Sequence, residues 1–261
     1  METKRVRVIG AGLAGSEAAL QLASFGFDVD LYEMRPEKPT PAHRGGALAQ
    51  LVCSNSFKGL ALTSAHGLLK NELNMLGSFL LKAAERTAVP AGESLTVNRD
   101  LFSEEVERLI LACPNITLHR EEVKTLEGEF PTIVAAGPLA SDTLADDIFK
   151  RLGSERLHFF DAIAPVVETE SIDFEHAFYK NRWEKGETED FINCPLDKET
   201  YDLFVQKLRE AESIEPRPFE KHELFEGCLP IEEMARRGTE TLRYGPMRPV
   251  GLGINPTGKK W

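Results

Sequence analysis

Residues 5–15 read Arg-Val-Arg-Val-Ile-Gly-Ala-Gly-Leu-Ala-Gly, a short apolar strand that runs into the pattern G-x-G-x-x-G. An alanine- and leucine-rich stretch over 16–25 predicts a helix, and 29–32 predicts a second strand that ends on Glu33. In such a unit the first glycine permits a tight turn, the second lets a pyrophosphate approach the backbone, and the third lets the helix pack on the strand. The helix N-terminus adds unpaired N–H groups and a partial positive charge that favour a phosphate.

The predicted phosphate-binding residues are therefore the glycines and the residues between them: Gly10, Ala11, Gly12, Leu13, Ala14 and Gly15. Glu33 follows roughly 20 residues after the glycines, where an acid accepts hydrogen bonds from ribose hydroxyls. The order of strand, glycines, helix, strand and acid favours dinucleotide binding over an ordinary strand–helix–strand turn. The pattern does not distinguish FAD from NAD.

Length and composition indicate an ordinary globular chain. Its 261 residues are enough for one large domain or two modest ones, and 42% of them are hydrophobic and 28% charged. No apolar stretch reaches the roughly 20 residues that span a bilayer. The first four residues lead directly into the first strand without the pattern of a signal peptide. We therefore expect a cytoplasmic protein that does not contact a membrane.

The distribution of charge is uneven. A net charge of −11 opposes nonspecific binding of nucleic acid by the chain as a whole. Residues 235–261, however, carry six basic side chains against one acid, Glu240. Such a run is more often a solvated surface than a contact for RNA or phosphate, and both interpretations remain open here.

Hydrophobic spacing predicts the elements that follow the opening unit. They are helices over 67–86 and 101–111, and strands over 116–119, 123–126 and 132–136. We interpret the last of these as a buried strand that runs into Gly137, as expected where a parallel strand meets a cofactor.

The pattern of predicted elements changes near residue 150. We predict a dinucleotide-binding domain of α/β class over 1–150 and a second, substrate-binding domain with a loop-rich tail over 151–261. In the second domain we expect strands at 159–167 and 191–192. Asp197 is expected to cap a helix over 198–212.

The four cysteines do not form a metal or redox motif. No two are close enough in sequence for a C-x-x-C pair, and we predict no metal site. In a reducing compartment all four are expected to be free thiols. Cys113 and Cys194 each precede a proline, and we interpret both as small packing residues.

Two segments around the other cysteines are specific. Residues 51–56 read Leu-Val-Cys-Ser-Asn-Ser, and 225–230 read Phe-Glu-Gly-Cys-Leu-Pro. Further characteristic segments occur in order at 8–15, 32–36, 40–43, 66–70, 136–139, 160–165, 192–195 and 244–252. Together they resemble the bacterial folate- and FAD-dependent tRNA uracil-5-methyltransferases over nearly the whole chain.

The resemblance implies a fold and a reaction. The fold is a Rossmann-like FAD-binding domain with an inserted smaller α+β domain. The reaction transfers a one-carbon unit from 5,10-methylenetetrahydrofolate to C5 of a uridine in the tRNA T loop. Reduced FAD supplies the electrons and carries the carbon in that family, and NAD(P)H reduces the flavin. Arg35 lies in a matching segment and joins Glu33 and Gly137 among the cofactor-binding residues, and the two family cysteines match Cys53 and Cys228.

The chemistry of uracil gives a reason, separate from the resemblance, for two cysteines in the site. A thiolate that adds at C6 converts C5 into a nucleophile, and a base must later remove the C5 proton. We predict Cys228 as the nucleophile and Cys53 as its partner. Because the thiolate is the reactive form, a nearby cation is expected, and Lys58 and the pair Arg236–Arg237 are candidates. His43 is expected either to touch the cofactor or to be a solvated loop residue.

Members of the family are considerably longer than this chain. We therefore expect the C-terminal return of the FAD domain to be missing, a sheet face to be exposed, and a second chain to be a possible partner. Two alternatives remain open: another FAD- or NAD-dependent oxidoreductase, and a non-catalytic fragment that binds an adenine nucleotide. NADH oxidation that depends on neither tRNA nor the two cysteines would favour the oxidoreductase. A lack of bound flavin would favour the non-catalytic fragment.

Overall fold

The computed structural model describes residues 4–40, 42–52, 54–152, 167–186, 188–212 and 229–253. The chain divides into two compact units. Unit 1 comprises residues 1–89 and 94–163, and unit 2 comprises residues 90–93 and 164–261. The domain boundary between residues 150 and 151 stays a prediction.

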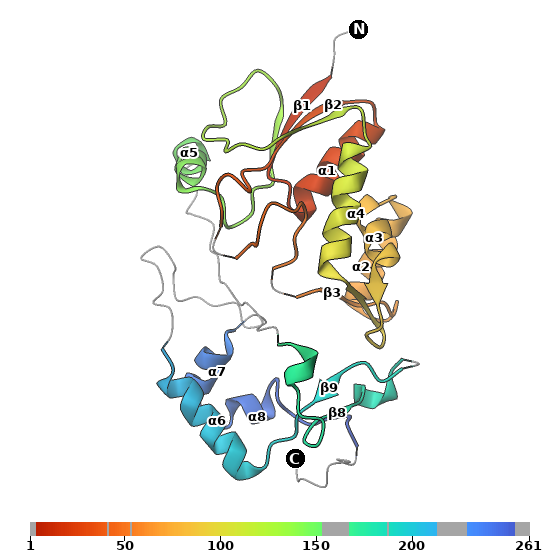
Figure 1. The fold of residues 1–261 in the computed structure, drawn as a ribbon. Coiled ribbons are helices and arrows are strands. Elements are labelled where there is room, and N and C mark those ends of the chain that lie inside the picture. The colour runs from red at the N-terminus through yellow and green to blue at the C-terminus, as the bar shows by residue number, and fades with distance from the viewer. Residues whose placement is uncertain are drawn as a thin grey trace. The chain divides into compact units, whose positions relative to one another are not determined.

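A four-stranded parallel sheet forms the centre of unit 1 (Figure 1). The strands lie in the order β6-β2-β1-β7. Their bounds are Arg5–Ile9 for β1, Asp28–Tyr32 for β2, Ile116–His119 for β6 and Thr132–Val134 for β7. Because β1 pairs with β2 on one side and β7 on the other, a crevice is expected outside the carboxyl ends of β1 and β7.

Helices cover both sides of this sheet (Figure 1). α1 (Leu13–Ser24), α3 (Phe79–Arg86) and α4 (Arg99–Leu111) lie on one side, and α5 (Asp142–Leu152) lies on the other. The core between strands and helices includes the fully buried side chains of Val8, Leu31, Phe102, Val106 and Ile110.

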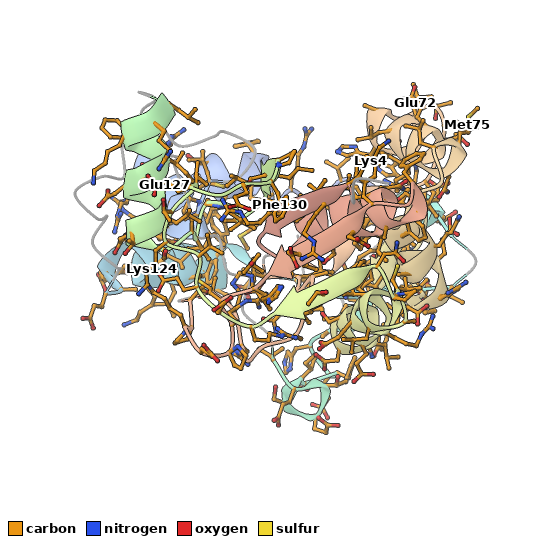
Figure 2. All side chains as sticks on the ribbon, turned by 90° about the horizontal axis from the view of Figure 1, so that it is seen from above. Lys4, Glu72, Met75, Lys124, Glu127 and Phe130 are labelled. Carbon is orange, nitrogen blue, oxygen red and sulfur yellow. The ribbon has the colours of Figure 1, made fainter. Side chains whose placement is uncertain are left out.

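An ion pair joins α5 to the segment before β7. Figure 2 labels Glu127 beside α5, and its carboxylate lies 3.0 Å from Nη2 of Arg151.

The single helix predicted over 67–86 is wrong, because the chain forms two helices there. α2 spans Ala65–Met75, and α3 begins after Gly77, whose φ of +81° is in the left-handed region. The carboxylate of Glu17 accepts hydrogen bonds from Ser78 Oγ and from the N–H groups of Phe79 and Leu80, which fixes the start of α3. The leucines that recur at helical spacing over 67–86 therefore do not share one face of a single helix. Leu80 is buried, whereas Leu76 is 77% exposed and Met75 points away from the sheet (Figure 2).

A short antiparallel sheet completes unit 1. Its order is β3-β5-β4, with β3 at Ser56–Gly59, β4 at Ala88–Val89 and β5 at Ser94–Val97. The strand predicted over 123–126 is absent from the described residues of that segment. The reason is local: the Leu126 N–H donates to Asp147 Oδ2, and its carbonyl accepts from Arg7 Nη2, so side chains take its backbone groups.

β7 differs from the buried strand that its apolar sequence predicts. It is the edge strand of the parallel sheet, so one side of it has no neighbouring strand among the described residues. Ile133 is 39% exposed and Val134 is 43% exposed.

Unit 2 combines short strands with helices. Its described elements are the 3-10 helices η1 (Thr169–Ser171) and η2 (Arg182–Glu184), strands β8 (Phe178–Tyr179) and β9 (Ile192–Asn193), and helices α6 (Lys198–Glu210), α7 (Ile231–Arg237) and α8 (Thr241–Tyr244). The predicted cap is confirmed, because Asp197 Oδ1 accepts from the Thr200 N–H at 2.9 Å. Tyr201 and Val205 of α6 pack against Ala235 and Leu242.

The strand predicted over 159–167 lies outside the described residues except at Val167, which is not in a strand. In the part of the chain that is described, no helix has both the length and the apolar character needed to cross a membrane.

Candidate functional site

A crevice of about 320 Å³ opens where the sequence predicts a nucleotide site. Residues at the end of β1 line it, together with the first turn of α1, the end of β2 and the segment after β7. The strand order therefore places the glycine-rich turn and Gly137 at one opening, outside the carboxyl ends of neighbouring parallel strands.

Each of the three glycines has a different environment. Gly10 has a φ of +97°, and a Cβ there would lie 2.6 Å from the Ala135 carbonyl oxygen. A Cβ on Gly15 would lie 1.7 Å from the Gly10 carbonyl oxygen, so the predicted close packing of helix on strand is confirmed. A Cβ on Gly12 would meet nothing within 4 Å among the described residues, its chain neighbours aside. Gly12 lines the crevice, so its lack of a side chain leaves space for a ligand.

The N-terminus of α1 is open toward this space. No side chain caps the helix at Gly12, and its first turn has no acidic residue. Leu13 and Ala14 of this turn line the crevice with Gly12. The N–H groups of a first helical turn have no partner within the helix, so this terminus has the character of an anion site.

Ala11 has a structural place beneath the crevice. It is fully buried, and its N–H donates to Glu33 Oε2 at 3.1 Å. Its carbonyl oxygen accepts from the Ala49 N–H at 2.9 Å and from Ser16 Oγ at 3.2 Å. Ala11 therefore holds the glycine turn in position, and neither it nor Gly15 lines the crevice.

Glu33 and Arg35 form a buried ion pair at the end of β2. Glu33 Oε1 accepts from Arg35 Nε at 2.9 Å and from the Arg35 N–H at 3.1 Å, and both side chains are almost fully buried. Burial favours the neutral carboxyl, but the hydrogen bonds and charge of Arg35, with the Ala11 N–H, outweigh it and lower the pKa of Glu33. Glu33 lines the crevice as a carboxylate, the form that accepts hydrogen bonds from hydroxyl groups.

The loop after β2 closes another side of the crevice. The Gln50 side chain accepts from the Arg44 N–H and donates to the Arg44 carbonyl, both at 2.9 Å. His43 lines the crevice, and its Nδ1 lies 2.6 Å from Thr40 Oγ1. Burial and the charge of Arg35 lower the pKa of His43, which favours a neutral imidazole at pH 7.

Sequence reasoning missed several lining residues beyond the glycine turn. Gly137, predicted at the end of the last strand, lines the crevice at a φ of +66°, and Glu121, Glu122 and Ser141 also line it. Hydrogen bonds from Lys38 and Ser141 lower the pKa of Glu122. No local signal identifies these acids, because they follow β6 in an irregular segment.

The predicted catalytic cysteines, Cys53 and Cys228, lie outside the described residues. Val52, which precedes Cys53 in the sequence, lines the crevice. Among the predicted cations, Lys58 is exposed at a φ of +68°, and Arg236 and Arg237 both lie within 4 Å of Glu233 on their own helix, at 3.6 and 3.7 Å.

The other two cysteines differ from each other. Cys113 is half-buried and packs against the core of unit 1, as predicted. Cys194 is exposed, so its interpretation as a packing residue is wrong. Leu196 packs against the core of unit 2 instead.

The parallel sheet with a glycine-rich turn at its switch point defines a Rossmann-like α/β protein. The chain matches the family described as glucose inhibited division protein A over residues 5–258, and it belongs to that family. It is 52% identical over 257 residues to a protein of Aquifex aeolicus (strain VF5) named methylenetetrahydrofolate--tRNA-(uracil-5-)-methyltransferase TrmFO. It is 50% identical over 256 residues to the protein of that name from Lactobacillus helveticus (strain DPC 4571).

These similarities cover 98% of this chain, but 58% of the Aquifex protein and 63% of the Lactobacillus protein. The chain thus spans about three fifths of the length of the curated relatives it matches. Among solved structures, Aquifex aeolicus GidA in its form II crystal is 22% identical over 48% of this chain and 20% of that chain, with a TM-score of 0.39.

Proposed function

We propose that this chain is the FAD-binding part of a cytoplasmic enzyme that methylates C5 of a uridine in the T loop of tRNA, with 5,10-methylenetetrahydrofolate as the carbon source. The observation that carries the proposal is 52% identity over 98% of the chain to a protein named for that reaction. Bound FAD supplies the redox chemistry, and we propose NAD(P)H as its reductant.

The crevice of unit 1 suits the pyrophosphate and ribose of FAD. The open space at Gly12 and the uncapped N-terminus of α1 favour a pyrophosphate there. Glu33 is the proposed acceptor for ribose hydroxyls, and Arg35 holds its carboxylate in place. Gly137, with space on the side where a Cβ would stand, is the proposed close approach on the β7 side.

Binding of FAD can be tested on the purified 261-residue chain. We expect a flavin absorbance spectrum, or uptake of added FAD with quenching of its fluorescence. Gly59→Ala is expected to retain FAD binding, because its Cβ makes only an ordinary contact, 3.8 Å from Ser64 Oγ, and Gly59 does not line the crevice. A chain that neither retains nor takes up FAD contradicts this part of the proposal.

The proposed covalent step uses Cys228, whose thiolate adds to C6 of uracil, while Cys53 is its proposed partner in handling the C5 proton. Transcripts that contain 5-fluorouracil are expected to trap this adduct, because fluorine cannot leave C5 as a proton does. The Cys228→Ser variant is expected to lose the adduct, whereas Cys113→Ala, which alters a half-buried packing residue, is expected to retain it. An adduct that survives in Cys228→Ser refutes this assignment.

A further inference from the structure

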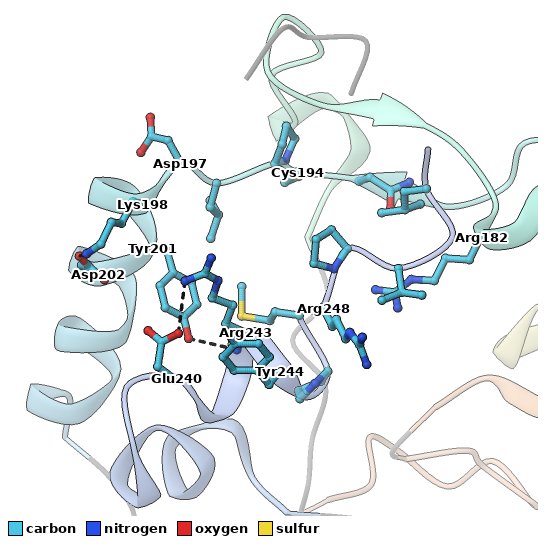
Figure 3. Close-up of a pocket in the computed structure, with 18 of the residues that line it drawn as sticks. Arg182, Cys194, Asp197, Lys198, Tyr201, Asp202, Glu240, Arg243, Tyr244 and Arg248 are labelled. Carbon is cyan, nitrogen blue, oxygen red and sulfur yellow. Dashed lines mark hydrogen bonds and ion pairs between the residues drawn. The ribbon is translucent and has the colours of Figure 1, made fainter. Parts of the chain in front are cut away.

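A second cavity lies within unit 2. Its volume is about 670 Å³, within the range of small-ligand sites. The segment after β9, the first turns of α6, and α8 with the residues after it line the cavity, and Arg182 of η2 reaches it from another side (Figure 3). The FAD crevice uses none of these residues.

Acidic groups in this wall already have partners. Asp202 lies 2.5 Å from Lys198 Nζ, Glu240 lies 3.3 Å from Arg243 Nη1, and Asp197 caps α6. Arg182 and Arg248 are exposed, and neither guanidinium contacts an acid in the described parts of the chain. These two lining residues therefore leave uncompensated positive charge at the cavity.

An exposed aromatic ring lines the same cavity (Figure 3). Tyr244 is 69% exposed, and Arg243 Cζ lies 5.8 Å from the centroid of its ring. The ring is thus available to stack on another planar group, a contact that tolerates any base. Exposed tyrosines and unpaired arginines together are the elements that bind the unstacked nucleotides of RNA loops.

The wall is fixed by hydrogen bonds before any ligand binds. Tyr201 Oη donates to the Thr239 carbonyl at 2.6 Å and accepts from the Arg243 N–H at 3.1 Å, which ties α8 to α6. The Met247 N–H donates to the Leu242 carbonyl at 2.9 Å and turns the chain after α8. The positions of Arg243, Tyr244 and Arg248 are therefore set by the core of unit 2.

We propose that this cavity binds an unpaired nucleotide of the tRNA substrate. Its base would stack on Tyr244, and the phosphates on either side of it would contact Arg182 and Arg248. The inference rests on the proposed function, since that function supplies the RNA. It also gives a role to part of the basic run at 235–261, in a chain whose net charge of −11 otherwise opposes nucleic acid.

The experiment measures the affinity of the 261-residue chain for an end-labelled tRNA transcript by fluorescence anisotropy at several salt concentrations. We expect the double variant Arg182→Ala, Arg248→Ala to bind about tenfold or more weakly. The slope of log K against log salt is expected to fall by about 0.7 for each lost phosphate contact. Tyr244→Ala is expected to weaken binding by about five- to a hundredfold with an unchanged slope, and Tyr244→Phe to restore it.

The matched control is Lys207→Ala, Arg209→Ala, which removes two positive charges from the last turns of α6 outside the cavity. A second readout needs no variant. Saturating tRNA is expected to slow alkylation of Cys194, an exposed lining residue, but not of Cys113, as measured by mass spectrometry of the peptides.

The outcomes separate the two proposals. If the chain forms the Cys228 adduct but the double variant and its control bind tRNA equally, the cavity inference is overturned and the proposed function stands. If the wild-type chain binds inorganic phosphate but no tRNA, the inference that the cavity binds a nucleotide of tRNA is also overturned. Loss of flavin binding and of the adduct, by contrast, counts against the proposed function itself.

Discussion

Gly12→Asp is expected to weaken FAD binding nearly a thousandfold while leaving the fold intact. Gly12 is the N-cap of α1, with φ −72° and ψ −167°, an extended conformation that aspartate adopts without strain. Apart from its chain neighbours, no heavy atom of the described residues lies within 4 Å of the position of its Cβ, so the new side chain meets open space there. Aspartate is moreover a preferred N-cap, and its charge suits the positive end of the helix. The stability of the free protein is thus expected to stay the same or to rise by a few tenths of a kcal/mol.

The same carboxylate would occupy the proposed pyrophosphate position. Two like charges about 4 Å apart repel by about 4 kcal/mol at an effective dielectric constant of 20. That energy corresponds to a Kd for FAD nearly a thousandfold weaker. Gly12→Asn is the matched comparison, because asparagine has the same shape and capping ability without the charge. The difference between the two variants isolates the electrostatic part of the effect.

The assay combines two measurements on the same proteins. Thermal unfolding followed by circular dichroism, without FAD, checks that Gly12→Asp and Gly12→Asn are folded. Quenching of flavin fluorescence during an FAD titration then gives each Kd. Equal affinities of the aspartate and asparagine variants for FAD would refute the placement of the pyrophosphate at this helix N-terminus.

Three further predictions concern stability, each measured by urea unfolding. Gly15→Ala is expected to destabilise the chain by about 1–3 kcal/mol, because its Cβ would lie 1.7 Å from the Gly10 carbonyl oxygen; a loss no larger than that of Gly12→Ala would contradict this. The lowered pKa of Glu33 means that its stabilising effect is complete above its ordinary pKa of 4.5 and is lost as the pH falls through the lower folded-state pKa. Glu33→Gln is therefore expected to cost about 3–5 kcal/mol at pH 7 by leaving Arg35 unpaired, and to flatten the acid limb of the stability profile; an unchanged limb would contradict this. Ser103→Ala is expected to be neutral or stabilising by about 1 kcal/mol, because the buried Ser103 Oγ has no hydrogen-bond partner among the described residues, and a clear loss of stability would reveal a missed partner.

The parts of the fold that the sequence predicts well depend on local rules. The glycine spacing, the strand before it and the acid after it belong to one continuous segment, and each is a direct consequence of backbone geometry. The positive φ of Gly10 and the contact at Gly15 follow from that geometry. The Asp197 cap is similarly local, because the acceptor and the N–H it satisfies are three residues apart.

The predictions that were wrong concern features that depend on contacts between residues far apart in sequence. The helix break near Gly77 was not predicted, because the leucine spacing continues through it. The groups that stabilise the break come from Glu17, 61 to 63 residues away from the partners it binds. The edge position of β7 depends on strand order, which the composition of a three-residue strand does not encode.

Glu33, the acid of the crevice, shows what a prediction of residue type from sequence leaves out about that residue's environment. Sequence reasoning places Glu33 as an acceptor for ribose hydroxyls, but both of its oxygens already accept N–H groups, from Ala11 on one side and Arg35 on the other. A carboxylate offers roughly four lone-pair sites, so these bonds leave capacity for a hydroxyl donor. They also orient the carboxylate before a ligand arrives, because Ala11 belongs to the glycine turn itself. The proposed ribose recognition and the shape of the glycine turn therefore depend on one side chain, and a substitution at Glu33 is expected to affect both.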